Sequence, residues 1–177
     1  MDATASDMSG IRIEPIAAAH IDSFHRALDV VAREKKYLSM LEATPLPDTR
    51  AFVMGMIAKA NPQFVAIAQD EVVGWCDIDR HFFPSHAHRG KLGMGILPAY
   101  RGQDLGQKLI ETTLRAAQDA GFLRVELDVY QDNHRAIALY DKMGFMREGI
   151  IRRAARIDGR FIDAIGMALL FDEDGPA

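Results

Sequence analysis

The stretch 94–107 (MGILPAYRGQDLGQ) constrains the possible fold more than any other part of the chain. A short apolar run is followed by a proline, then by Arg101 and Gly102, and then by the apolar spacing of an amphipathic helix that opens near Leu105. This order predicts a strand, a tight loop and a helix start. The first amides of a helix have no partner within it, and the helix dipole is positive at that end, so such a loop attracts anions. We therefore expect this stretch to hold a phosphorylated cofactor.

Regular spacing of apolar residues predicts further helices and strands on both sides of the stretch. Before it we expect a strand at 11–15, a helix at 20–33 that continues or restarts through 33–41, a second helix from a cap at Asp48 or Thr49 to about Ala60, and an antiparallel hairpin of 64–68 with 72–78. After it we expect a helix at 105–120, a strand at 125–130, a short helix capped by Asn133, and a closing hairpin of 145–154 with 161–171. Because strands and helices alternate, with hairpins at both ends, the predicted class is α/β with a mixed sheet.

The length of the chain fits one domain. With 177 residues, 49% of them hydrophobic, the chain can bury a core of its own, and a second domain is not expected. We expect this domain at 11–171, with a flexible N-terminus at 1–10 and a loose tail at 172–177.

Charge and cysteine content exclude several classes of protein. The net charge is −4 and the basic residues are spread along the chain, which does not indicate a nucleic-acid partner. No apolar run approaches the roughly 20 residues that span a bilayer, and the first residues lack the features of a signal peptide. The single cysteine, Cys76, suits a reducing compartment. The expected location is the cytoplasm, without membrane contact.

Two local patterns in this order of elements resemble the GNAT superfamily of N-acetyltransferases. The first is the superfamily's loop Arg/Gln-x-x-Gly-x-Gly/Ala, matched in part by 101–106. The second is Asn-x-x-Ala-x-x-Leu-Tyr-x-x-x-Gly-Phe, matched at 133–145 after an intervening helix and strand. The resemblance implies a single-domain fold with a mixed, mostly antiparallel sheet of six to seven strands, about four helices and splayed central strands. The chain looks most similar to bacterial enzymes that acetylate amino acids or other small amines, and next to enzymes that acetylate protein N-termini.

The resemblance implies acetyl-CoA as cosubstrate and assigns residues to it. Loop amides would cradle the pyrophosphate, the strand before the loop would pair with the pantetheine arm and polarise the acetyl oxygen, and the residue before the short helix would contact the arm, cap the helix, or do both. The residues assigned in this way are Met94, Gly95, Ile96, Leu97, Arg101, Gly102, Gln103, Asp104, Leu105, Gly106, Gln107 and Asn133. The glycines at 93 and 95 suit a bulged, splayed strand.

The resemblance also implies direct acetyl transfer to a primary amine in a ternary complex. Tyr140 is the expected general acid for the departing thiolate, with a plain core tyrosine as the alternative. Asp128, on the polar face of the strand 125–130, is the expected base, directly or through water. The alternatives are a merely salt-bridged Asp128, and Glu126 on the same face as the base.

Asp104 is the one departure from the loop pattern, since it stands where the superfamily has glycine. A carboxylate near a pyrophosphate is repelled unless it turns outward, and a positive φ at this position would add a strain of ~1 kcal/mol. We favour ordinary cofactor binding with Asp104 turned outward. The rival from another class is a non-catalytic acyl-CoA-binding regulatory module.

The acceptor and the partners are less constrained. A metal site at His81, His86 and His88 is not expected, because no cysteine or carboxylate completes a ligand set, so these histidines line the substrate site or lie on the surface. The acceptor is expected to be amino acid-like or polyamine-like. A homodimer through the closing strands is a further possibility.

Overall fold

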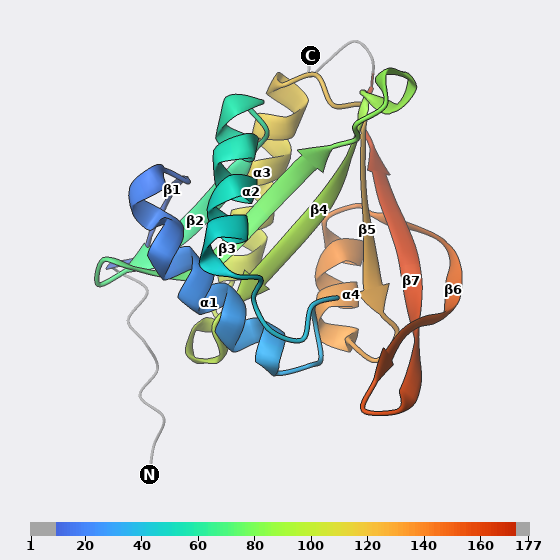
Figure 1. Ribbon diagram of the computed structural model, residues 1–177. Coiled ribbons are helices and arrows are strands. Elements are labelled where there is room, and N and C mark those ends of the chain that lie inside the picture. Colours follow the sequence, from blue (N-terminus) through green and yellow to red (C-terminus); the bar gives the residue numbers. More distant parts are fainter. Residues whose placement is uncertain (1–9, 173–177) are drawn as a thin grey trace.

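A computed structural model describes residues 10–172 and contains one seven-stranded sheet (Figure 1). The strand order is β1-β2-β3-β4-β5-β7-β6. The strands are β1 (Arg12–Pro15), β2 (Gln63–Ala68), β3 (Glu71–Arg80), β4 (Arg89–Ile96), β5 (Arg124–Tyr130), β6 (Met146–Ile157) and β7 (Arg160–Leu170). The pair β4–β5 is parallel and the other neighbouring pairs are antiparallel. The predicted α/β class and mixed, mostly antiparallel sheet are therefore confirmed.

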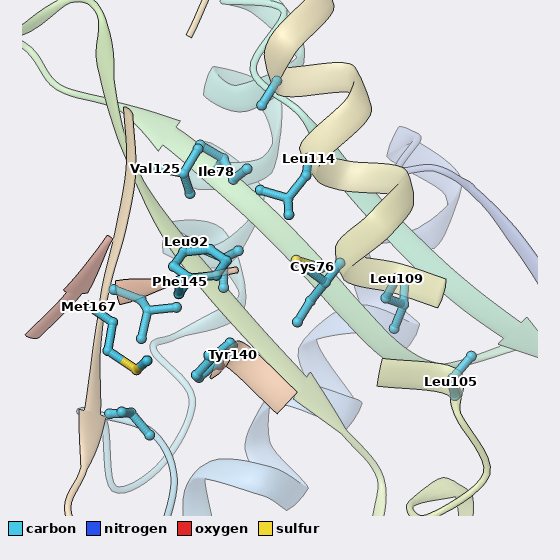
Figure 2. Packing of buried hydrophobic residues seen from close by; sticks show 14 of the residues in the cluster. Cys76, Ile78, Leu92, Leu105, Leu109, Leu114, Val125, Tyr140, Phe145 and Met167 are labelled. Carbon is cyan, nitrogen blue, oxygen red and sulfur yellow. The ribbon is translucent and has the colours of Figure 1, made fainter. Parts of the chain in front are cut away.

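Within residues 10–172, four α-helices cover the two faces of the sheet. Helices α1 (Ile21–Arg33) and α2 (Leu46–Ala58) lie over one face, and α3 (Leu105–Asp119) lies over the other (Figure 1). Helix α4 (His134–Lys142) follows β5. Since successive strand residues point to opposite faces, Trp75 of β3 packs in a core with α1, whereas Cys76 packs in a second core with α3. Figure 2 shows Cys76 of β3 beside Leu109 and Leu114 of α3.

The central strands β4 and β5 are hydrogen-bonded only at one end. Their pairing joins Arg89–Lys91 of β4 to Arg124–Glu126 of β5 and stops there. Beyond that point the two strands diverge (Figure 1). The splayed centre implied by the resemblance is present, and it leaves backbone groups on the facing edges of β4 and β5 without a strand partner.

The glycines expected to mark a bulge in the splayed strand β4 do not form one against β3. The register between β3 and β4 runs from Gly74–Ile96 to Arg80–Gly90 without a shift, so β4 carries no bulge on this side. A Cβ on Gly95 would come within 2.3 Å of the Trp75 ring. The absence of a side chain at position 95 therefore makes room for the indole.

Two predictions about the first helices were wrong. Residues 34–45 form an irregular loop instead of a continued helix, because Lys35 takes a positive φ of 56° directly after α1. Helix α2 begins at Leu46, before the predicted caps, since a proline is tolerated in the first turn where no amide partner is required. The Thr49 side chain is buried and lies 3.2 Å from the Thr44 hydroxyl oxygen.

The remaining elements follow the predicted order, with ends that differ by a few residues. Within the described residues, no helix is both long and apolar enough to cross a membrane. The flexible N-terminus expected at 1–10 and the loose tail expected at 172–177 lie, apart from Gly10 and Asp172, outside the described part of the chain.

Candidate functional site

A cavity of about 160 Å³ opens between the splayed strands β4 and β5. Strand β4 and the loop before α3 contribute one wall, and α4 contributes the other. Its lining residues are Val31, Tyr37, Met94, Gly95, Ile96, Arg101, Asp128, Val129, Asn133, Arg135, Ala136, Leu139 and Tyr140. The cavity, hereafter the β4–β5 cavity, thus brings together residues from both sequence patterns.

The loop before α3 has the backbone expected of an anion site. Gly102 has a φ of +75°, and the guanidinium of Arg135 lies above it, with Nη2 3.1 Å from where a Cβ would stand. The first amides of α3 have no partner within the helix, and the helix dipole adds positive potential there. Arg135 adds a full positive charge to this end. The sequence did not single out Arg135, although it lies two residues after Asn133 in the second pattern.

Asp104 precedes α3 in the left-handed conformation, with a φ of 59°. The positive φ considered for this position is therefore present. The Asp104 side chain is exposed and makes no capping hydrogen bond to the helix. This conformation is compatible with a carboxylate that faces solvent.

Several residues of the loop can reach a ligand only through their backbone. Leu105 is buried in the core, and a Cβ on Gly106 would meet Leu139 at 3.2 Å, so a small residue there lets α3 approach α4. The side chains of Gln103 and Gln107 are hydrogen-bonded within the protein, Gln103 to the Ala99 carbonyl and Gln107 to Glu111 and Lys142. Leu97 differs from these residues, because its amide donates to the Val73 carbonyl, its carbonyl accepts from the Tyr100 amide, and its side chain packs against both cores.

The Arg101 side chain fixes the loop to the segment that follows α1. Its Nε donates to the Ile96 carbonyl at 2.8 Å, and its Nη1 donates to Glu34 at 2.9 Å. The guanidinium also lies 4.7 Å from the centre of the Tyr37 ring. With these contacts made, the Arg101 side chain supports the loop, while its backbone remains the part that can face a ligand.

Tyr140 lies on α4 with 7% of its surface exposed and lines the β4–β5 cavity. Its ring packs beside Phe145, with ring centres 5.7 Å apart, in the cluster drawn in Figure 2. Burial, and secondarily the neighbouring Cys76, raises the pKa of the Tyr140 phenol well above its usual value. The residue is therefore both core and cavity wall, and its hydroxyl stays protonated at neutral pH.

Asn133 caps α4, as predicted. Its Oδ1 accepts a hydrogen bond from the Ala136 amide at 3.2 Å. Because Asn133 also lines the β4–β5 cavity, the capping role and a contact with a ligand are compatible.

The two acidic residues predicted on β5 both hold cations. Asp128 is on the wall of the β4–β5 cavity, is largely exposed and forms an ion pair with Lys91. Burial raises the pKa of Glu126, but hydrogen bonds from Arg124, Arg89 and His81 outweigh that effect and hold it at about 2. Glu126 is therefore a structural anion and is poorly suited to act as a base.

A second cavity, of about 390 Å³, lies on the face covered by α1 and α2. Its lining is mostly apolar: Phe24, Leu28, Leu38, Ser39, Met40, Thr44, Asp48, Thr49, Phe52, Trp75, Asp77, Gly93 and Met94. We call it the α1–α2 cavity. Met94 lines both cavities, so they adjoin at β4.

Asp77 of β3, which the sequence analysis did not select, lies on the wall of the α1–α2 cavity. It is 8% exposed, and a Cβ on Gly93 would lie 3.2 Å from its Oδ1. Burial, and secondarily the negative charge of Asp79, raises the pKa of Asp77 to about 7. The available signal was an acidic residue inside the otherwise apolar run 72–78.

The histidines of the β3–β4 connection show no metal geometry. His81 bonds to Glu126 at 2.9 Å, and its ring centre lies 6.0 Å from that of His86. Among residues 10–172 no group of three potential ligands is close enough to hold a metal ion.

A third, more open hollow of about 850 Å³ lies at the turn between β6 and β7 and is lined by residues such as Asp132, Ile157 and Arg160. It is larger than the other two, but its lining contains none of the residues to which the resemblance assigned a role. Its size alone therefore gives no reason to place chemistry there.

The family comparison agrees with this geometry. The model of the acetyltransferase (GNAT) family matches residues 24–145. The L-amino acid N-acetyltransferase AaaT of Escherichia coli is 30% identical over 107 residues, which cover 60% of this chain and 66% of AaaT. The N-alpha-acetyltransferase RimI of Mycobacterium tuberculosis is 39% identical over 66 residues, which cover 37% of this chain and 40% of RimI.

A similar arrangement of elements is found in a crystal structure of a GNAT-family acetyltransferase from Streptococcus pneumoniae. The two structures align with a TM-score of 0.85 over 91% of this chain and 99% of the other, at 25% sequence identity.

Proposed function

The chain belongs to the acetyltransferase (GNAT) family, and we propose that it transfers the acetyl group of acetyl-CoA directly to a primary amine of a small molecule. The observation that carries this proposal is the β4–β5 cavity. It joins the loop before α3 to Asn133 and Tyr140, so a phosphate-binding region and a proton donor adjoin one slot.

The residues present fit acetyl-CoA. Unpaired edges of β4 and β5 offer amide and carbonyl groups to an amide-containing arm, and the start of α3 with Arg135 offers positive potential to phosphates. We propose that the strand residues Met94–Leu97, the loop residues Arg101–Gln107 and Asn133 hold it. When bound, acetyl-CoA supplies an acetyl thioester.

Tyr140 is the proposed proton donor. Its raised pKa keeps the hydroxyl protonated, so it can hydrogen-bond to a sulfur that gains negative charge. It exchanges its proton for one that the acceptor nitrogen releases. The phenol therefore stabilises the leaving group without changing its own charge over the whole reaction.

Asp128 is retained as a candidate base, directly or through water. It shares the β4–β5 cavity with Tyr140, which favours it. Its ion pair with Lys91 counts against it, since a proton taken from the acceptor would weaken that pair.

Acetylation of protein N-termini is the second candidate, and the local identity to the Mycobacterium tuberculosis RimI favours it. We prefer a small acceptor because the α1–α2 cavity is bounded by the loop that carries Leu38 and Met40. The third candidate, a CoA-binding module without catalysis, is disfavoured by Tyr140 on the cavity wall.

Release of free thiol from acetyl-CoA tests the proposal. The purified protein is incubated with acetyl-CoA together with one candidate acceptor at a time. The acceptors are aromatic and aliphatic amines, amino acids, polyamines and short peptides with free N-termini. Turnover with small amines is the expected result. Turnover with peptides alone would favour the N-terminal acetyltransferase, and acetyl-CoA binding without turnover would favour the non-catalytic module.

A further inference from the structure

Resting on this proposed acetyl transfer, we infer that Asp77 receives the acceptor's ammonium group in the α1–α2 cavity and takes its proton. The acceptor carries this amine on an apolar group with no neighbouring carboxylate.

The position of Asp77 is the first argument. It lies on β3 beside Gly93 of β4, and Gly93 is followed by Met94, which lines both cavities. Because position 93 has no side chain, the Asp77 carboxylate can lie close against the backbone of β4, where a Cβ would come within 3.2 Å of its Oδ1. An amine held at Asp77 therefore lies next to the strand that borders the β4–β5 cavity.

The lack of a partner for Asp77 is the second argument. Within the described residues, no hydrogen bond or ion pair to its carboxylate is found, although the residue is 8% exposed. A buried carboxylate without a cation is costly, so its retention points to a positively charged ligand. The neighbouring acids are differently placed: Asp79 accepts from Asn61, and Asp128 holds Lys91.

A buried amide beside Asp77 gives an independent observation. Gln63 of β2 is its register partner, so the two side chains lie on the same face of the sheet. Gln63 is 3% exposed, and in the described part of the chain its Oε1 and Nε2 have no hydrogen-bond partner. The region thus holds two adjacent polar groups without partners, and both offer acceptor oxygens of the kind that an ammonium requires.

The rest of the α1–α2 cavity defines the acceptor's other end. Phe24, Leu28, Phe52 and Trp75 supply apolar surface, and the cavity volume of about 390 Å³ suits a small molecule. The charged residues in its lining are Asp48 and Asp77, both acidic. The carboxylate of an amino acid would therefore meet repulsion here and no cation, whereas an apolar amine would not.

The proton balance is simple. Asp77 takes one proton from R–NH3+, and the freed amine forms the new N–C bond as the C–S bond breaks. Tyr140 gives its hydroxyl proton to the sulfur, which keeps the electron pair of the broken bond, and is reprotonated by the second proton that leaves nitrogen. Ammonium and thioester thus become amide, thiol and one proton. A base with a pKa near 7 accepts a proton from an amine better than an ordinary aspartate does.

A matched pair of acceptors tests the substrate class without any variant. 2-Phenylethylamine and L-phenylalanine differ only by a carboxylate, and spermidine supplies a polyamine without an apolar group. We expect kcat/KM for 2-phenylethylamine to exceed that of either other compound at least ~10-fold, since a missing charge partner costs that much or more. A preference for L-phenylalanine or spermidine would overturn the inferred acceptor class.

Substitution tests the role of Asp77 itself. Asp77→Asn should lower kcat/KM for 2-phenylethylamine ~100-fold, with acetyl-CoA affinity unchanged, and Asp77→Glu should restore part of the loss. Asp70→Asn, the same chemical change in the exposed turn between β2 and β3, is the control. Thermal unfolding of each variant confirms that it is folded.

The pH profile separates a base from a purely structural acid. Wild-type kcat/KM should fall below pH about 7 as Asp77 becomes protonated, and this fall should be absent in Asp77→Asn. The charged groups on the surrounding elements include Asp48 of α2, Asp79 of β3, Lys91 of β4 and Asp128 of β5. Asp128→Asn is therefore run in parallel.

The outcomes distinguish the two proposals. Activity that survives Asp77→Asn, or an acid fall that is lost only in Asp128→Asn, overturns the role of Asp77 and leaves the acetyl transfer intact. No turnover by the wild type with any amine overturns the acetyl transfer, and this inference with it.

Discussion

The Trp75 indole lies against the backbone of Gly95 on the neighbouring strand, so closely that a Cβ at position 95 would come within 2.3 Å of its Cη2. Trp75 is 3% exposed and meets the Phe24 ring edge to face, with ring centres 5.5 Å apart. The contact ties the floor of the α1–α2 cavity to the strand that borders the β4–β5 cavity.

Gly95→Ala should therefore destabilise the protein. The added methyl must displace a fully packed indole, which costs about 1–3 kcal/mol of the free energy of unfolding. Gly55→Ala on α2, where a Cβ would meet nothing within 4 Å, is the matched control and should stabilise the protein by up to about 1 kcal/mol. Urea unfolding of both variants measures the difference, and equal effects would contradict the close packing at Gly95.

Tyr140→Phe should lower turnover ~100-fold while leaving acetyl-CoA affinity unchanged, because the phenol acts on the leaving sulfur and not on binding. Steady-state kinetics with the best amine and a binding titration provide the two numbers. Tyr100→Phe removes a hydroxyl from a partly buried tyrosine outside the β4–β5 cavity and should leave turnover unchanged. Full activity of Tyr140→Phe would remove Tyr140 from the reaction.

Asp104→Gly should change acetyl-CoA affinity by no more than ~3-fold, since an exposed carboxylate that faces solvent contributes little repulsion. Asp104→Asn keeps a side chain that tolerates the left-handed backbone and removes only the charge. Titration of acetyl-CoA into the wild type, Asp104→Gly and Asp104→Asn measures the three affinities. A large gain in both variants would mean that the charge opposes the pyrophosphate, whereas a gain in glycine alone would mean that backbone strain does.

Glu126 should make stability depend on pH. Its pKa of about 2 lies below the usual 4.5, so its contribution is present above pH 4.5 and is lost as the pH falls toward 2. This difference in pKa corresponds to about 3 kcal/mol of the free energy of unfolding, which screening by solvent reduces to about 1–2 kcal/mol. Glu126→Gln should be less stable than the wild type at pH 7, and the gap should close on acidification.

Urea unfolding at pH 7 and at pH 3 checks this dependence. Glu148→Gln, which removes a more exposed partner of Arg124, should cost less at pH 7. A gap for Glu126→Gln that persists unchanged at low pH would show that packing, and not charge, is lost.

Features encoded by local spacing could be predicted from the sequence. Asn133 caps α4 as expected, because a cap and its helix are adjacent in the chain. Tyr140 lies on the wall of the β4–β5 cavity, and the resemblance pointed to it through a pattern of neighbouring residues. The α/β class followed from the alternation of apolar periods.

Features that depend on distant contacts could not be predicted. The Arg101 side chain bonds to Glu34, which lies 67 residues earlier in the chain. The loop pattern could therefore not show that only the backbone of Arg101 is left to face a ligand. The burial of Asp77 comes from its place between strands and under α1 and α2, and a single acidic residue in an apolar run does not reveal it. The loop after α1 was not predicted because no local sequence signal indicates the positive φ of Lys35.

The short pairing between β4 and β5 also divides the sheet into two halves, which affects the order in which its strands can assemble. Strands β1–β4 come from the continuous segment 12–96 and strands β5–β7 from the continuous segment 124–170, and three register pairs join them. Within the described residues, the pairs β2–β3, β3–β4 and β6–β7 join strands that follow each other in the chain, which favours their early formation within each half, and α3 connects the two halves. A ligand bound in the seam would join two separately assembled halves, so its binding energy would add to the cooperativity of the whole chain.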